Sequence, residues 1–167
     1  MDMVRKTQGL MIMDNNLLGS FKPKRWFEEI KINQTLDPVY KIATKQQLVM
    51  YAGASRDFVP IHYDYQVAQN AGHDQVIIHG ALKTAWLSQF VSQWAGVNSF
   101  ILELEVQYRA IDFPGEKLIC NGKVVKKTLG EFYGIVDIEI NLEKENGQIS
   151  VPGKAKLAIP SKEKILE

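Results

Sequence analysis

The second half of the chain alternates between apolar and polar side chains, which is the period of a β-strand that buries one face. The alternation falls into four runs, whose apolar positions lie within residues 100–108, 118–124, 136–142 and 151–159. Turn-forming dipeptides separate these runs at 114–115, 129–130 and 146–147. The pattern therefore predicts four consecutive strands.

The first half of the chain has helical periodicity instead. Between Gly80 and Ala95 a large apolar residue recurs every four positions, which predicts a mostly apolar helix that ends at Gly96. The recurring residues are Leu82, Trp86, Phe90 and Trp94. The elements predicted ahead of this helix are a strand over 39–42, a helix over 45–54 capped by Thr44, and a helix over 65–71 closed by Gly72.

Together these elements predict an α+β domain, in which a curled antiparallel sheet surrounds one apolar helix. At 167 residues the chain is about the size of a single domain. We expect this domain to span residues 25–160. An N-terminal arm over 1–24 would precede it, and a short tail over 161–167 would follow.

Composition narrows the class of protein. The 20 basic and 19 acidic residues nearly cancel and are scattered, so nucleic acid is a poor candidate partner. The single cysteine, Cys120, lies in an apolar run and is predicted to be a buried structural thiol, which fits a reducing compartment. The chain has neither a signal-peptide pattern at its start nor an apolar stretch of about 18 residues. We therefore expect a soluble, cytoplasmic protein without membrane contact.

All three histidines lie between Tyr51 and Ser88. Asp57 and His62 stand five residues apart, and Pro60 between them stiffens the loop. A carboxylate and an imidazole on such a loop could hold one water and move its protons, as the addition of water to a double bond requires. In the structural alternative, Asp57 caps a turn and His62 is a packed core residue, and the pair alone favours that alternative.

The run that follows changes this balance. Residues 76–78 are apolar and lead to His79 and Gly80, which open the main helix. The first turn of a helix presents free N–H groups and a positive dipole end, and a glycine lets a ligand approach closely. A thioester enolate could be stabilised there. The histidines, with Asp64 and Asp74, do not have tight metal-ligand spacing, so no metal site is predicted.

The order Asp57, Pro60, His62, His79, Gly80 and Ser88 resembles the signature of MaoC-like dehydratases and (R)-specific enoyl-CoA hydratases, D-x-N-P-x-H followed by H-G. The resemblance extends from about residue 25 to residue 160 and implies a hot-dog fold. It implies that Asp57 and His62 activate water, that the Gly80 N–H holds the thioester oxygen, and that Ser88 orients the aspartate. From periodicity alone, Ser88 fits the less apolar stripe of the helix almost equally well. Val59 replaces the family asparagine, which puts the fine positioning of the loop in question.

The resemblance implies reversible hydration of a trans-2-enoyl thioester, with coenzyme A as a part of the substrate and no metal or redox cofactor. Pro60, His79 and Trp86 would line the substrate. The partner expected is a second copy of the chain, or alternatively a different subunit of a heteromeric dehydratase. Hydrolysis by a hot-dog thioesterase is disfavoured because residues 80–95 contain no Asp or Glu. A non-catalytic acyl-binding subunit and a ligand-free interaction domain remain open alternatives.

Overall fold

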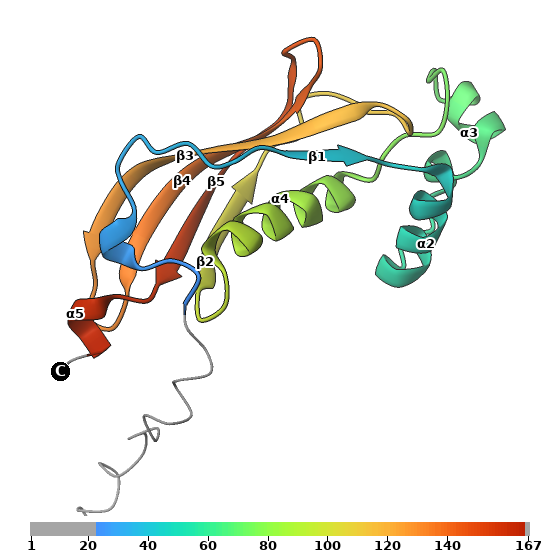
Figure 1. Cartoon of the computed structure of the whole chain (residues 1–167). Helices are drawn as coiled ribbons and strands as arrows, with labels where there is room; N and C mark the ends of the chain where they lie inside the picture. Colours follow the sequence, from blue (N-terminus) through green and yellow to red (C-terminus); the bar gives the residue numbers. More distant parts are fainter. Residues whose placement is uncertain (1–22, 166–167) are drawn as a thin grey trace, which may run out of the picture.

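The computed structural model describes residues 23–165, which form an antiparallel sheet curved around one long helix (Figure 1). The sheet has five strands in the order β1-β3-β4-β5-β2. The strands are β1 (Val39–Ile42), β2 (Phe100–Val106), β3 (Lys117–Leu129), β4 (Gly134–Lys144) and β5 (Ile149–Ile159). All of their pairings are antiparallel. The predicted α+β architecture is confirmed.

Helix α4 (Gly80–Ala95) runs along the concave face of the sheet (Figure 1). The remaining helical elements are η1 (Phe27–Glu29), α2 (Lys45–Ser55), η2 (Pro60–His62), α3 (Tyr65–Asn70) and α5 (Lys162–Ile165). Helices α2 and α3 lie beyond the N-terminal end of α4, while η1 and α5 lie at the opposite end (Figure 1). The segment between α2 and α3 is thereby brought to the start of α4.

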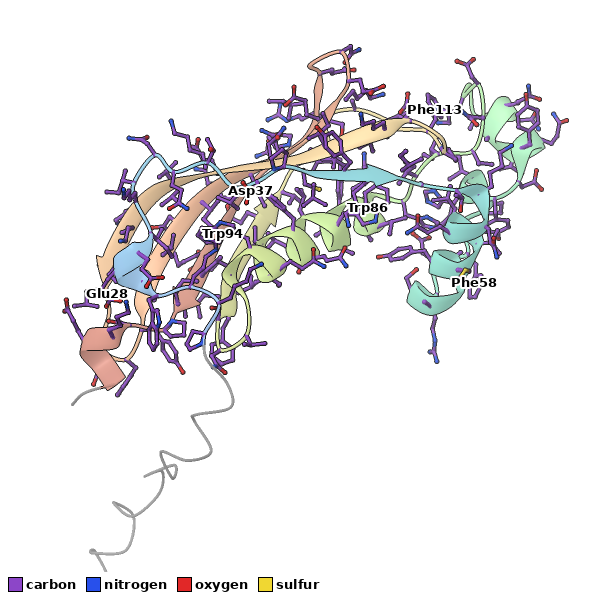
Figure 2. All side chains as sticks on the ribbon, in the orientation of Figure 1. Glu28, Asp37, Phe58, Trp86, Trp94 and Phe113 are labelled. Carbon is purple, nitrogen blue, oxygen red and sulfur yellow. The ribbon has the colours of Figure 1, made fainter. Side chains whose placement is uncertain are left out.

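The core forms between α4 and the concave face of the sheet. Trp86 and Trp94 point from α4 toward the strands (Figure 2), and both are at least nine-tenths buried. Leu87 on the same helix is fully buried, as are Cys120 and Leu142 on the sheet. Burial of each of these leucine side chains contributes about 1.5–3 kcal/mol. This packing explains why the apolar residues recur every four positions, because those positions share one helix face.

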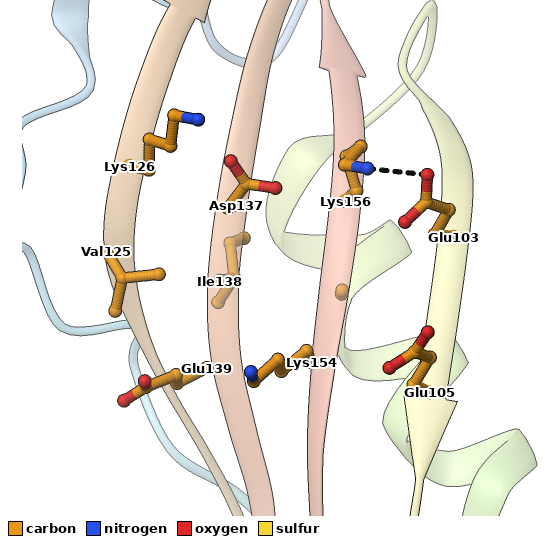
Figure 3. A pocket seen from close by; sticks show the side chains of 10 residues that line it. Glu103, Glu105, Val125, Lys126, Asp137, Ile138, Glu139, Lys154 and Lys156 are labelled. Carbon is orange, nitrogen blue, oxygen red and sulfur yellow. Dashed lines mark hydrogen bonds and ion pairs between the residues drawn. The ribbon is translucent and has the colours of Figure 1, made fainter.

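The convex face of the sheet carries charges of alternating sign. One row runs across four strands through Lys126, Asp137, Lys156 and Glu103 (Figure 3). A second row runs through Lys123, Glu139, Lys154 and Glu105. Neighbours in a row are therefore opposite in charge, which stabilises cross-strand pairs modestly. The charged convex face and the apolar concave face together produce the alternation seen in the sequence.

Strand β3 is longer than its apolar pattern predicts. Its pairing with β4 shifts between Val124 and Lys126, so one residue bulges and the alternation changes phase. Beyond the bulge the strand continues to Leu129 with mostly exposed side chains. Alternation of apolar and polar residues identifies a strand only while the alternation keeps its phase. The predicted strand therefore ends at Val124, where the bulge changes that phase.

Residues just outside the predicted domain, at both ends, make hydrogen bonds to it. Lys24, within the predicted arm, donates to the carbonyl of Gln93 at 2.6 Å. Ser161, in the predicted tail, is buried and donates to Glu28 at 2.6 Å. The rest of the arm, residues 1–22, lies outside the described residues. Among the helices of residues 23–165, none is long and apolar enough to span a bilayer.

Candidate active site

A short rigid loop carries Asp57 and His62. Helix α2 is followed by its C-cap Arg56, whose left-handed φ of 59° turns the chain sharply away from the helix. Pro60 then opens the single turn η2, and the hydroxyl of Tyr63 donates to the carbonyl of Phe58 at 2.7 Å. The start of the loop is thus set by the left-handed turn at Arg56, and the rest by η2 and the hydrogen bond from the Tyr63 side chain.

The loop brings the two groups face to face. The Nε2 of His62 lies 3.9 Å from Oδ2 of Asp57. His62 is 8% exposed, whereas the Asp57 side chain is 36% exposed. The Nδ1 of His62 lies 2.8 Å from the carbonyl of Ile77, which can only accept, so the neutral ring carries its hydrogen on Nδ1. Nε2 is left with a lone pair directed toward the carboxylate side.

His62 belongs to a cluster of packed aromatic rings. The ring of His79 stacks on that of His62 with centroids 3.7 Å apart and an interplanar angle of 20°. The ring of Tyr51 lies edge-on to that of His79, with centroids 5.1 Å apart. Burial, and then the proximity of His62, lower the pKa of His79, so this ring is neutral. Burial also raises the pKa of Tyr51, with further contributions from Tyr108 and Asp57.

Gly80 begins α4 directly beside this stack, because His79 is the N-cap of the helix. A Cβ at Gly80 would lie 3.0 Å from the ring of Tyr108. The hydroxyl of Tyr108 is 2.7 Å from that of Thr84, one turn further along α4. The first turn of α4, with its free N–H groups, therefore lies next to the acid-histidine pair and under an aromatic ring.

One oxygen of Asp57 and one ring nitrogen from each of His62 and His79 lie within 4.8 Å of one another. Three such ligands are sufficient in number for a divalent metal. However, the two imidazoles are stacked nearly parallel, so their in-plane lone pairs do not converge on one point. Moreover, Nδ1 of His62 is already bonded to Ile77. The arrangement suits a water between Asp57 and His62 better than a metal ion.

The other predicted site residues are placed as follows. Pro60 lies between Asp57 and His62 in the sequence and is the first residue of η2. Ser88 is half-buried two turns beyond Gly80, and the described residues include no hydrogen bond between Ser88 and Asp57. Trp86 is buried in the core. The roles predicted for Ser88 and Trp86 stay predictions. Val59 is 54% exposed, and its backbone carbonyl accepts from the His62 N–H at 3.3 Å.

Sequence reasoning missed a buried ion pair beside the site. The Nζ of Lys83 lies 2.8 Å from Oδ2 of Asp112, and both residues are at least 97% buried. Lys83 is the single charged residue of α4, which is the signal that could have revealed it. A lone charge on an otherwise apolar helix must find a partner if it is buried.

Comparison with known proteins identifies the family. Residues 27–146 match the model of the MaoC-like domain. The chain belongs to the MaoC-like dehydratase family. In this MaoC-like domain three of the residues that carry the resemblance, Asp57, His62 and Gly80, lie close together around the start of α4.

The relatives of this MaoC-like chain are distant. It is 24% identical over 115 residues to the (R)-specific enoyl-CoA hydratase of Aeromonas caviae, covering 68% of this chain and 84% of the relative. The solved structure of the A. caviae hydratase superposes with a TM-score of 0.72 at 22% identity, over 80% and 99% of the two chains. The structure of R-hydratase PhaJ1 of Pseudomonas aeruginosa superposes with a TM-score of 0.74 at 21% sequence identity, over 81% of this chain and 86% of that one. A chain of the ChsH1-ChsH2 complex of Mycobacterium tuberculosis superposes with a TM-score of 0.69 at 17% sequence identity, over 77% of this chain and 98% of that one. These likenesses confirm the hot-dog fold.

Proposed function

We propose that the protein is a hydro-lyase that adds water reversibly to a trans-2-enoyl thioester, giving an (R)-3-hydroxyacyl thioester. The observation that carries this proposal is the geometry of Asp57 and His62. Their facing atoms are 3.9 Å apart, too far for a direct hydrogen bond but close enough for one water to bond to both. A carboxylate and a neutral Nε2 both accept, so such a water would donate one hydrogen to each.

The reaction balances without any oxidant or reductant. The oxygen of the held water forms a bond to C3 of the enoyl group, while one of its protons passes to the Asp57–His62 pair. The electrons of the C2–C3 double bond move onto the thioester oxygen, where the Gly80 N–H stabilises the enolate. The pair then delivers a proton to C2 from the same side, which gives syn addition. We assign the proton to the pair as a whole rather than to either residue.

The thioester carrier is proposed to be coenzyme A. The A. caviae relative is named as an enoyl-CoA hydratase, which supports this choice. Hydrolysis is a weaker candidate, since α4 contains no Asp or Glu and Asp57 is the nearby acid. The ChsH1-ChsH2 relative is a complex, which keeps an acyl-binding subunit of a heteromeric dehydratase as the second candidate.

We further propose that the chain forms a homodimer through β2. This strand ends the sheet, so one of its sides is not paired within the described chain. Phe100 and Leu102 on it are more than half exposed. An apolar open edge is a site of strand pairing with another chain. A light-scattering mass equal to two chains would support a dimer, and the variant Leu102→Lys should then weaken it.

A direct assay separates the candidate functions. Crotonyl-CoA is incubated with the pure full-length chain, and the loss of enoyl-thioester absorbance is followed alongside the release of free thiol. Hydration predicts a loss of absorbance without thiol release, whereas a thioesterase would release thiol. Absence of both, with longer and branched enoyl-CoAs also inert, would contradict the proposal and favour the acyl-binding subunit.

A further inference from the structure

The buried pair of Lys83 and Asp112 is unfavourable for the fold if considered alone. Lys83 is 3% exposed and Asp112 is fully buried. Removing two charges from water is costly, and apolar residues of similar size are often at least as stabilising. The lysine also stands in the first turn of α4, where the helix dipole opposes a positive charge. Stability is therefore a poor explanation for the presence of this pair.

The pair connects α4 to the segment that follows β2. Besides its contact with Asp112, the Nζ of Lys83 donates to the carbonyl of Ala110 at 2.9 Å. Tyr108, in the same segment, packs its ring against Gly80 and bonds to Thr84. The segment therefore contacts the first turn of α4 through both the ion pair and the aromatic ring that covers Gly80.

Asp112 also reaches the other half of the site through its backbone. Its carbonyl accepts from the N–H of Ile78 at 2.9 Å. The preceding residue, Ile77, bonds to Nδ1 of His62 through its carbonyl at 2.8 Å. The Ile77 N–H donates to Ile61 at 3.2 Å. The Asp112 carbonyl and the His62 Nδ1 thus bond to the N–H and the C=O of the same peptide unit, between Ile77 and Ile78, and that peptide fixes the tautomer and direction of His62.

Asp112 is itself held from a third element. The Nζ of Lys144, at the end of β4, lies 3.5 Å from Oδ1 of Asp112 and donates to the carbonyl of Ile111 at 2.8 Å. It also lies 3.4 Å from Glu116. The carboxylate of Asp112 therefore sits between two lysines, one on α4 and one on the sheet, and fixes the helix start relative to the sheet.

We propose that Lys83 and Asp112 are positioning residues that fix the Gly80 N–H relative to His62. The inference rests on the proposed function, because the two positioned groups are the enolate donor and one member of the acid-base pair. A displacement of about 1 Å between such groups is enough to lower a rate by about a hundredfold. Neither residue needs to touch the substrate.

The test replaces the pair by apolar residues, Lys83→Met with Asp112→Leu, which removes both charges of the pair, while Lys144 keeps Glu116 as its ionic partner. The matched control is Lys156→Met with Asp137→Leu, since Asp137 also lies between two lysines, but on the exposed convex face (Figure 3). Four quantities are measured on the full-length chain: the unfolding midpoint, the ring signals of His62 by NMR, and kcat and KM for the enoyl-CoA that the wild type hydrates.

The inference predicts a folded variant with shifted His62 ring signals and a kcat lowered by about 10- to 100-fold, with KM changed less. The control variant should match the wild type in its His62 ring signals and in kcat. His62 signals that coincide with those of the wild type in a folded variant would overturn the inference, as would an unchanged kcat. If the apolar pair does not fold, Asp112→Asn is read by the same measurements and the same criteria.

Failure of this inference is distinguishable from failure of the proposed function. A wild-type chain that hydrates no enoyl thioester contradicts the proposed function. The NMR signals of His62 still report in that case whether the pair positions the imidazole. The chain contains three histidines, so His62→Gln and His79→Phe suffice to assign the ring signals.

Discussion

The imidazole of His79 lies flat against that of His62, with centroids 3.7 Å apart. His79 is thus a buried, neutral ring that packs against the candidate acid-base residue His62. Neither of its ring nitrogens makes a hydrogen bond of ordinary geometry within the described chain. Protonation of His79 would bury a charge next to another imidazole, which is the reason its pKa is lowered.

This lowered pKa predicts how stability depends on pH. An unfolded histidine takes up a proton near its ordinary pKa of about 6.5, whereas the folded His79 does so only at lower pH. The unfolded state therefore binds more protons between these two values, and the free energy of unfolding decreases as the pH falls below about 6.5. His79→Phe removes this contribution. The difference in unfolding midpoint between variant and wild type should favour the variant more at pH 5 than at pH 7.5. A pH-independent difference would contradict the prediction.

The role of the Gly80 N–H can be separated from the lack of a side chain at that position. Gly80→Ala keeps the N–H and adds a Cβ beside Tyr108, whereas Gly80→Pro also removes the N–H. Proline is compatible with the first position of a helix, and His79 before it is extended, with ψ of 132°. We expect Gly80→Pro to have a kcat lower than that of Gly80→Ala by about 10²–10³. Equal kcat values in the two folded variants would place the enolate elsewhere.

The thiol of Cys120 should be unreactive in the folded protein. The side chain is fully buried on β3, and burial raises its pKa to about 11. Because the thiolate is the reactive form, iodoacetamide at pH 8 should leave the native protein unmodified under conditions that alkylate the urea-unfolded chain completely. Mass spectrometry measures the modified fraction. Rapid alkylation of a chain that keeps its native circular dichroism would rule out this placement of Cys120.

Local patterns account for most of what the sequence could predict. Helix α4 begins at Gly80 and ends at Ala95, as predicted, because the apolar period is regular and Gly96 ends it with φ of 84°. The N-cap of α2 was also predictable, since Thr44 accepts from Gln47, three residues away. The stiff loop around Pro60 indicated that Asp57 and His62 could hold one water, although the pair alone favoured a structural role.

Features that depend on distant contacts could not be predicted in this way. Lys83 and Asp112 are 29 residues apart, and neither one indicates the other in the sequence. The ring of Tyr108 covers Gly80 only because the segment after β2 folds back over α4. His79 was predicted to open the main helix, but its stacking on His62 follows from the meeting of two loops, which periodicity does not describe.

The central claim is that Asp57 and His62 act together on one water. Hydration of crotonyl-CoA, or of whichever enoyl-CoA the wild type prefers, is measured for Asp57→Asn and His62→Gln, each shown to be folded by its unfolding midpoint. Acid-base catalysis predicts that kcat falls by about 10²–10⁴ in each variant. Wild-type kcat in either folded variant would contradict the claim and leave the pair with a structural role alone.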